Sequence, residues 1–237
     1  MPRRLFLLTM AVGAALITTA SLDYFDPELL PPFVIEKLPL RFETLWLASL
    51  RIHVASALLS LPLCLLLMTR TLQRRGKLHR WVGRIAASVI LFGLVPSGAV
   101  LAFDAKGGAV VTAGFLLSGA IVGWCVVRGV QAARRRELLT HQRAMNHVVA
   151  QMSVAVSSRA LIIGLDVLGW NPDVSYVVAL WVPVLASAAV AELVSRRPAL
   201  SAPRLFVPVE RNRREVSAEG VLVRVHAGVR PVARVGR

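Results

Sequence analysis

Residues 70–103, RTLQRRGKLHRWVGRIAASVILFGLVPSGAVLAF, join a basic segment to an apolar run of about 20 residues, the length that crosses a ~30 Å hydrocarbon core. The same alternation repeats along the 237-residue chain, which is 56% hydrophobic. We expect six membrane spans, at about 5–22, 44–68, 82–103, 109–129, 145–169 and 175–195. These runs lack the period-two alternation of barrel strands. The sequence therefore predicts an all-α, polytopic transmembrane bundle.

The cations between the spans fall in every second break, within residues 3–4, 70–84, 128–143 and 196–197. The other breaks are mostly acidic. The positive-inside rule then places both termini in the cytoplasm, and the even number of spans agrees with that orientation. We expect a multi-pass protein of a bacterial cytoplasmic (inner) membrane. The first span has an alternative interpretation as a signal peptide that is cleaved near Ala20.

The composition changes after the sixth span. We expect a transmembrane domain at 1–195 and a basic tail at 196–237, in which ten arginines face three glutamates. Such a composition predicts a mostly disordered segment. Its expected partner, beyond the lipid bilayer itself, is the anionic headgroup layer at the cytoplasmic face. Nucleic-acid binding is not expected, because aromatic residues do not interleave with the basic ones.

Polar residues inside the second span form one stripe. Ser49, His53, Ser56, Ser60 and Cys64 lie within about 80° of one another on a helix, at 100° per residue. We expect this stripe to face the interior of the bundle.

The fifth span carries Arg159 and Asp166, seven residues apart and so on one helix face. At ~1.5 Å per residue, His53 lies about 13 Å and Arg159 about 15 Å from the outer ends of their spans. The sequence therefore predicts an outer-half polar cluster of His53, Arg159, Asp166 and Ser56. Two interpretations stay open: an Arg159–Asp166 pair with a hydrogen-bonded His53 that locks two helices together, or a ligand or proton site.

A second, inner-face cluster is predicted from His79, Arg80, Arg84, His141 and Arg143. Trp81 is typical of an interfacial anchor, and Arg80 and Arg84 are one turn apart, suited to lipid phosphates. One interpretation is a belt that faces headgroups. The other is a site in which His79 approaches His141 or His147. Gly119 and Gly123 form a GxxxG pair, either a helix-packing face or a chance spacing.

The segment Lys77–Ile85, KLHRWVGRI, resembles the LHRWLGRIY signature of an uncharacterised bacterial membrane family, domain of unknown function 2306. HQRAM at 141–145 is similar to the family's HRRWM pattern, with Ala144 in place of tryptophan and His147 in place of arginine. His53 and Arg159 match a histidine and an arginine of the family. The resemblance covers about 44–170 and implies a multi-helix membrane fold that groups His53, His79, His141 and Arg159. It implies no activity.

Three functions are compatible with these patterns. A non-catalytic bundle that acts as an assembly partner or scaffold needs no special chemistry. A redox protein would hold haem b or a quinone through histidines, with His79, His141 and His147 as the candidate haem ligands. A small proton-coupled transporter would use His53, Arg159 and Asp166. The motifs of soluble enzymes, GxSxG, the P-loop and HExxH, are absent from the sequence.

Overall fold

The computed structural model describes residues 2–26, 32–37, 40 and 42–196, and all regular secondary structure in these ranges is helical. Six of the helices are long and apolar enough to cross a membrane, which confirms the predicted all-α transmembrane bundle. The expected basic tail and part of the acidic loop near residues 23–43 lie outside the described residues.

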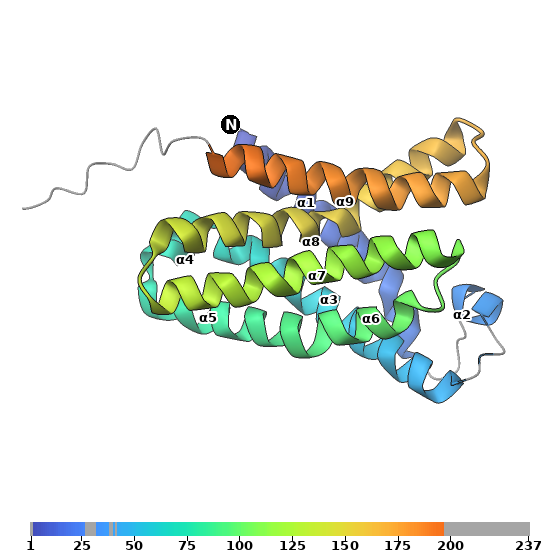
Figure 1. Cartoon of the computed structure of the whole chain (residues 1–237), viewed down its shortest axis with the longest axis horizontal. Helices are drawn as coiled ribbons and strands as arrows, with labels where there is room; N and C mark the ends of the chain where they lie inside the picture. Colours follow the sequence, from blue (N-terminus) through green and yellow to red (C-terminus); the bar gives the residue numbers. More distant parts are fainter. Residues whose placement is uncertain (1, 27–31, 38–39, 41, 197–237) are drawn as a thin grey trace, which may run out of the picture. The chain divides into compact units, whose positions relative to one another are not determined.

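The elements are α1 (Pro2–Ser21), the 3-10 helix η1 (Leu22–Phe25), α2 (Pro32–Lys37), α3 (Glu43–Leu67), α4 (Arg70–Arg74), α5 (Gly76–Ser88), the π-helix η2 (Val89–Leu94), α6 (Val95–Ala102), α7 (Gly108–Arg134), α8 (Leu138–Val167) and α9 (Pro172–Arg196). Together α5, η2 and α6 make one continuous span, Gly76–Ala102. Successive spans run in opposite directions. We call the end that holds α4, the start of α1 and the end of α9 the arginine-rich end, and the end that holds α2 the opposite end (Figure 1).

Two helices begin earlier than their apolar runs suggest. The third span was expected from residue 82 and the fifth from residue 145, but the helices begin at Gly76 and Leu138. Arginine and lysine are good helix formers, so a helix continues into the basic segments that precede these apolar runs. His79 and His141 therefore lie on the first turns of long helices rather than in turns.

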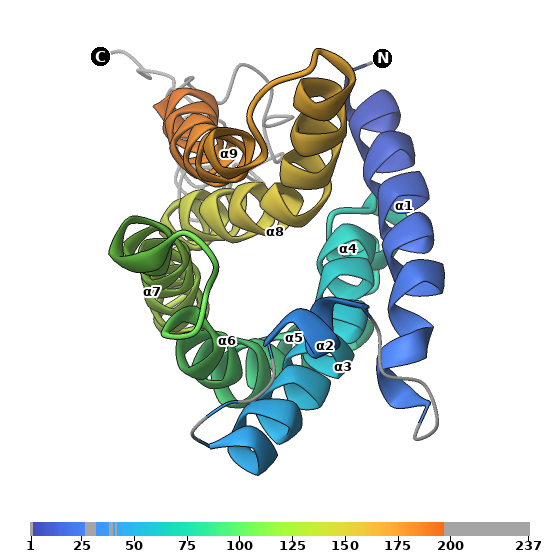
Figure 2. The ribbon, with the colours of Figure 1, turned by 90° about the vertical axis from the view of Figure 1, so that its right-hand side faces the viewer.

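Seen from the end of the bundle, α1, α3, the α5–α6 span, α7 and α8 follow one another around it, and α9 lies beside α8 on the outside (Figure 2). α8 packs against both α7 and α9, while α3 packs against α1, α5, η2 and α6. The largest apolar cluster fills the interior with side chains such as Met10, Leu61, Ile90, Val122 and Met152. A smaller cluster of Val111, Val154, Leu180 and Val184 joins α7, α8 and α9.

The predicted GxxxG pair is not the main contact of its helix. A Cβ added at Gly119 would meet no atom within 4 Å, and one at Gly123 would meet only Val95, at 3.8 Å. The close approaches of α7 lie at Gly114, against Leu180, and at Gly129, against Met145. Small residues permit helix contact only where a neighbour lies opposite.

Candidate functional site

The third span changes its hydrogen-bond pattern at its midpoint. In η2 the Val95 amide donates to the Ile90 carbonyl, five residues back, and the next residue is Pro96, which has no amide hydrogen. A π-helical turn of this kind leaves carbonyl groups with altered partners and is frequent at functional sites. The polar stripe of α3 packs directly on this turn.

His53 is held by the backbone of this interrupted helix. Its Nδ1 lies 3.2 Å from the Leu94 carbonyl oxygen and 3.4 Å from the Ser97 hydroxyl. The Ser97 hydroxyl lies 2.6 Å from the Gly93 carbonyl, to which it donates. These contacts tie the imidazole of α3 to η2 and α6 and fix the orientation of the ring.

The contacts of His53 also assign its tautomer. A carbonyl oxygen only accepts hydrogen bonds, so Nδ1 carries the hydrogen that faces Leu94. The other ring nitrogen, Nε2, then has a free lone pair in the neutral ring. Among the described residues Nε2 has no hydrogen-bond partner. This nitrogen is available to a proton or a ligand.

Two glycines make room for this contact. A Cβ at Gly98 would lie 2.9 Å from His53 Cε1, and a Cβ at Gly93 would collide with the Ser56 hydroxyl. Ser49, Ser56 and Ser60 are buried, as the helical spacing of the stripe predicts. The absence of side chains at Gly93 and Gly98 lets α3 approach close enough for His53 to reach Leu94.

Arg159 lies on α8, three residues after Val156, whose side chain lies against Gly13 of α1. Its guanidinium donates one hydrogen bond, from Nη1 to the Ala155 carbonyl at 2.9 Å, and its side chain is exposed. Its helix, α8, packs against α3, the helix of His53. Four further N–H groups of this guanidinium have no partner among the described residues.

The expected pair of Arg159 with Asp166 does not form. Within residues 42–196, ion pairs join His147 and Arg196 to Glu192, and none joins Arg159 to Asp166. Asp166 is exposed near the end of α8. The physical reason is the direction of the arginine, which folds back by one turn, toward the middle of the helix, onto the carbonyl of Ala155.

Two histidines lie at the arginine-rich end of the bundle, His79 on α5 and His141 on α8. His141 Nδ1 lies 2.8 Å from the Gly129 carbonyl of α7, which leaves its Nε2 open. His79 Nδ1 is buried without a hydrogen-bond partner among the described residues. The approach of His79 to His141 stays a prediction, and Arg80, Arg84 and Arg143 are exposed.

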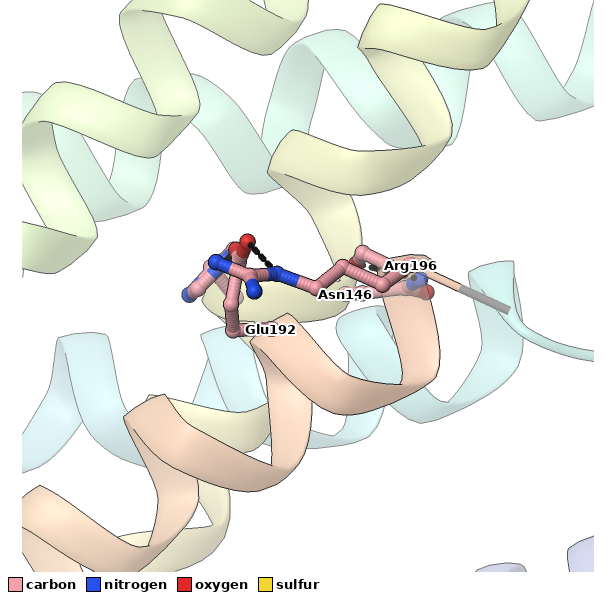
Figure 3. A network of polar contacts seen from close by, with 5 residues as sticks. Asn146, Glu192 and Arg196 are labelled. Carbon is pink, nitrogen blue, oxygen red and sulfur yellow. Dashed lines mark hydrogen bonds and ion pairs between the residues drawn. The ribbon is translucent and has the colours of Figure 1, made fainter. Parts of the chain in front are cut away.

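His147 lies apart from this pair. Its Nε2 is 3.4 Å from Glu192 Oε2 of α9, and Glu192 also binds Arg196 at 2.7 Å. Asn146 donates to the Ser195 hydroxyl at 3.3 Å beside them (Figure 3). His147 thus belongs to an exposed α8–α9 contact, because six residues after His141 it points to a different side of the helix.

Sequence reasoning missed two parts of the polar interior. The first part is Ser97 and the Leu94 carbonyl, which hold His53. The only feature of the sequence that marks this place is the neighbouring Pro96. Gln151, nearly fully buried on α8, accepts from Ser118 at 3.0 Å and donates to the Val184 carbonyl at 3.1 Å. A lone glutamine in an apolar span was the available signal. It ties α7, α8 and α9 together.

Residues 50–195 match the model of a family described as predicted membrane protein (DUF2306). The chain belongs to this family. The match extends beyond the expected 44–170 to include α9, so the sixth span is part of the family fold. No curated protein and no solved structure matches the chain. This multi-pass membrane protein therefore takes no activity from a relative, and within the described residues no group of three or more potential metal ligands is found.

Proposed function

We propose that this membrane protein is a carrier for anionic small molecules and that His53 and Arg159 form its binding site. The observation that carries the proposal is the presence of two incompletely satisfied side chains on helices α3 and α8, which pack against each other. His53 has no hydrogen bond at Nε2 among the described residues, and the Arg159 guanidinium has one backbone partner and no carboxylate. Lipid makes idle polar groups expensive, so such groups mark binding pathways.

The chemistry of the two side chains defines the ligand class. A guanidinium presents a planar fork that matches carboxylate or phosphate oxygens. Neutral Nε2 accepts a proton, so an anion bound beside it brings a proton or shares one with the ring. At this depth the remainder of the ligand meets apolar surroundings. The class is a small amphipathic acid with one anionic end, and its binding is coupled to a proton.

The backbone of the third span favours a carrier over a scaffold. Carriers form their binding sites where spans depart from regular α-helix near the middle of the membrane, and the π-helical turn η2 followed by Pro96 is a local departure within a continuous span. The apolar cluster around Leu61, Ile90 and Met152 separates His53 from the histidines of the arginine-rich end.

The binding test uses three probe molecules that share a phenyl ring and differ in charge: one is negative, one neutral and one positive. Benzoate, benzyl alcohol and benzyltrimethylammonium are added at equal concentration to the full chain in lipid nanodiscs, and the unfolding temperature is measured. We expect benzoate to raise it most, since it is the one probe of the three with a negative charge that can pair with the Arg159 guanidinium. In proteoliposomes, benzoate uptake driven by an inward proton gradient tests the carrier step.

Arg51 supplies the matched control. It lies on α3 two residues from His53, and its side chain is exposed on a different side of that helix. Arg159→Gln should abolish the benzoate shift, whereas Arg51→Gln should retain it. Equal shifts for the three probes, or equal losses in the two variants, would contradict an anion site at Arg159.

A second candidate function rests on His79 and His141. The buried, unpartnered Nδ1 of His79 and the open Nε2 of His141 are the ligand atoms that a haem iron or another metal requires. His147 is removed from this set by its contact with Glu192. The visible spectrum of protein purified after expression with added haem precursor decides the haem case: a Soret band lost in His79→Leu supports it, and a colourless protein argues against it.

For the cellular location we propose a bacterial cytoplasmic membrane with the arginine-rich end in the cytoplasm. The clustering of arginines at one end of the bundle supports this orientation. Reporter fusions within 70–80 and 131–143 should give cytoplasmic activity, and a fusion within 104–108 should give activity on the other side. Two reversed signals would contradict the orientation.

A further inference from the structure

The outward face of α5 carries a basic hollow that the carrier site does not use. Lys77, Arg80, Trp81 and Arg84 line a surface hollow of about 270 Å³. Their spacing, i, i+3, i+4 and i+7, places them on one helix face. His79 belongs to a different face, because its Nδ1 is buried within the bundle.

The charges of this basic hollow are uncompensated. None of Lys77, Arg80 and Arg84 has an ion-pair partner within the described ranges, and no acidic side chain lines the hollow. The Arg84 guanidinium lies 5.5 Å from the Trp81 ring centroid, a cation–π contact that orients it. Three cations on one exposed face form a site for a phosphate-bearing ligand.

The surface next to the basic hollow favours a phospholipid over a free phosphate as the ligand. Trp81 is 62% exposed, and the exposed Ile85 and Phe92 continue an apolar surface along the same span. Tryptophan is enriched at the level of lipid headgroups. A soluble phosphate gains nothing from these side chains, whereas a phospholipid places its headgroup on the arginines and its acyl chains on the apolar surface.

We propose that the basic hollow of α5 binds the headgroup of an anionic phospholipid. The ligand contacts are Arg80 and Arg84 to the phosphate, with Lys77 as a further positive charge and Trp81 at the boundary between headgroup and acyl chains. The segment is the one that carries the KLHRWVGR motif, so this lipid contact gives a physical role to the basic and aromatic positions of that motif.

Native mass spectrometry of the full chain in detergent tests the site. Phosphatidylglycerol and phosphatidylcholine are titrated separately, and inorganic phosphate is added in a third series. Each cation near an anionic lipid surface contributes about fivefold in affinity, so Arg80→Gln/Arg84→Gln should weaken phosphatidylglycerol binding by about thirtyfold. The control Arg134→Gln/Arg135→Gln removes the same charge from exposed positions at the end of α7. Its affinity for phosphatidylglycerol should stay within about twofold of that of the unchanged protein.

Three further results would contradict parts of this proposal. Equal losses in the two double variants would overturn the site, because any surface charge would then serve. Displacement of the lipid by millimolar inorganic phosphate would overturn the lipid assignment in favour of a free anion. Trp81→Leu keeps all three charges, should fold even where the double variant does not, and should lower the preference for phosphatidylglycerol over inorganic phosphate. An unchanged preference in that variant would contradict the role of Trp81.

Discussion

His53 and His147 both lie on membrane-spanning helices, yet their surroundings differ completely. The His53 ring is held by a backbone carbonyl of a π-helical turn. Two glycines, which have no side chains, leave the space that lets α3 approach this turn. His147 meets the exposed carboxylate of Glu192 at 3.4 Å, beside Arg196 (Figure 3). The first environment is built by several elements at once, and the second is an ordinary contact between neighbouring helix ends. The comparison teaches that a histidine in a span gains a special role from the backbone around it.

The largest expected effect comes from closing the space that admits His53. In Gly98→Ala the new Cβ lies 2.9 Å from His53 Cε1, so the ring or α6 must shift, at a cost of about 1–3 kcal/mol in unfolding free energy. The matched control is Gly119→Ala on α7, where nothing lies within 4 Å and the helix gains up to about 1 kcal/mol. Thermal unfolding in detergent measures both. Two stabilised variants would show that His53 is not held tightly.

The next effect compares the histidines themselves. His53→Gln removes the ring that spans from α3 to Leu94 and Ser97, and we expect a loss of about 1–2 kcal/mol in unfolding free energy. His147→Gln removes one exposed contact and should leave the unfolding temperature unchanged, because exposed ion pairs contribute little. A larger loss in His147→Gln than in His53→Gln would reverse the comparison.

The smallest effect concerns the carboxylate that was expected beside Arg159. Asp166→Asn should change the unfolding free energy by no more than about 0.5 kcal/mol, because Asp166 is exposed and forms no ion pair with Arg159. Asp173→Asn, at an exposed position at the start of α9, is its control. A clear loss of unfolding free energy for Asp166→Asn, with none for Asp173→Asn, would show that Asp166 does pair with Arg159.

The sequence was sufficient to predict the membrane-spanning helices and, for the second span, which side chains are buried. Runs of apolar residues predict six spans, and the 100° spacing predicts the burial of Ser49, Ser56 and Ser60. It was not sufficient for the side-chain partners. Arg159 and Asp166 share a helix face, but a flexible arginine chooses between a carboxylate and a carbonyl according to its rotamer, which no spacing encodes. The partner of His53 is a backbone carbonyl, which every residue possesses, so no residue type marks it.

The central claim is that His53 Nε2 and Arg159 together receive an anion. Nitrogen NMR of ¹⁵N-histidine-labelled protein in nanodiscs tests it directly, since the chain has only 5 histidines and His53→Gln identifies the signal. We predict a ring protonated at Nδ1 whose Nε2 resonance moves when benzoate is added and stays in place in Arg159→Gln. A resonance that ignores benzoate, or that moves equally without Arg159, would contradict the claim.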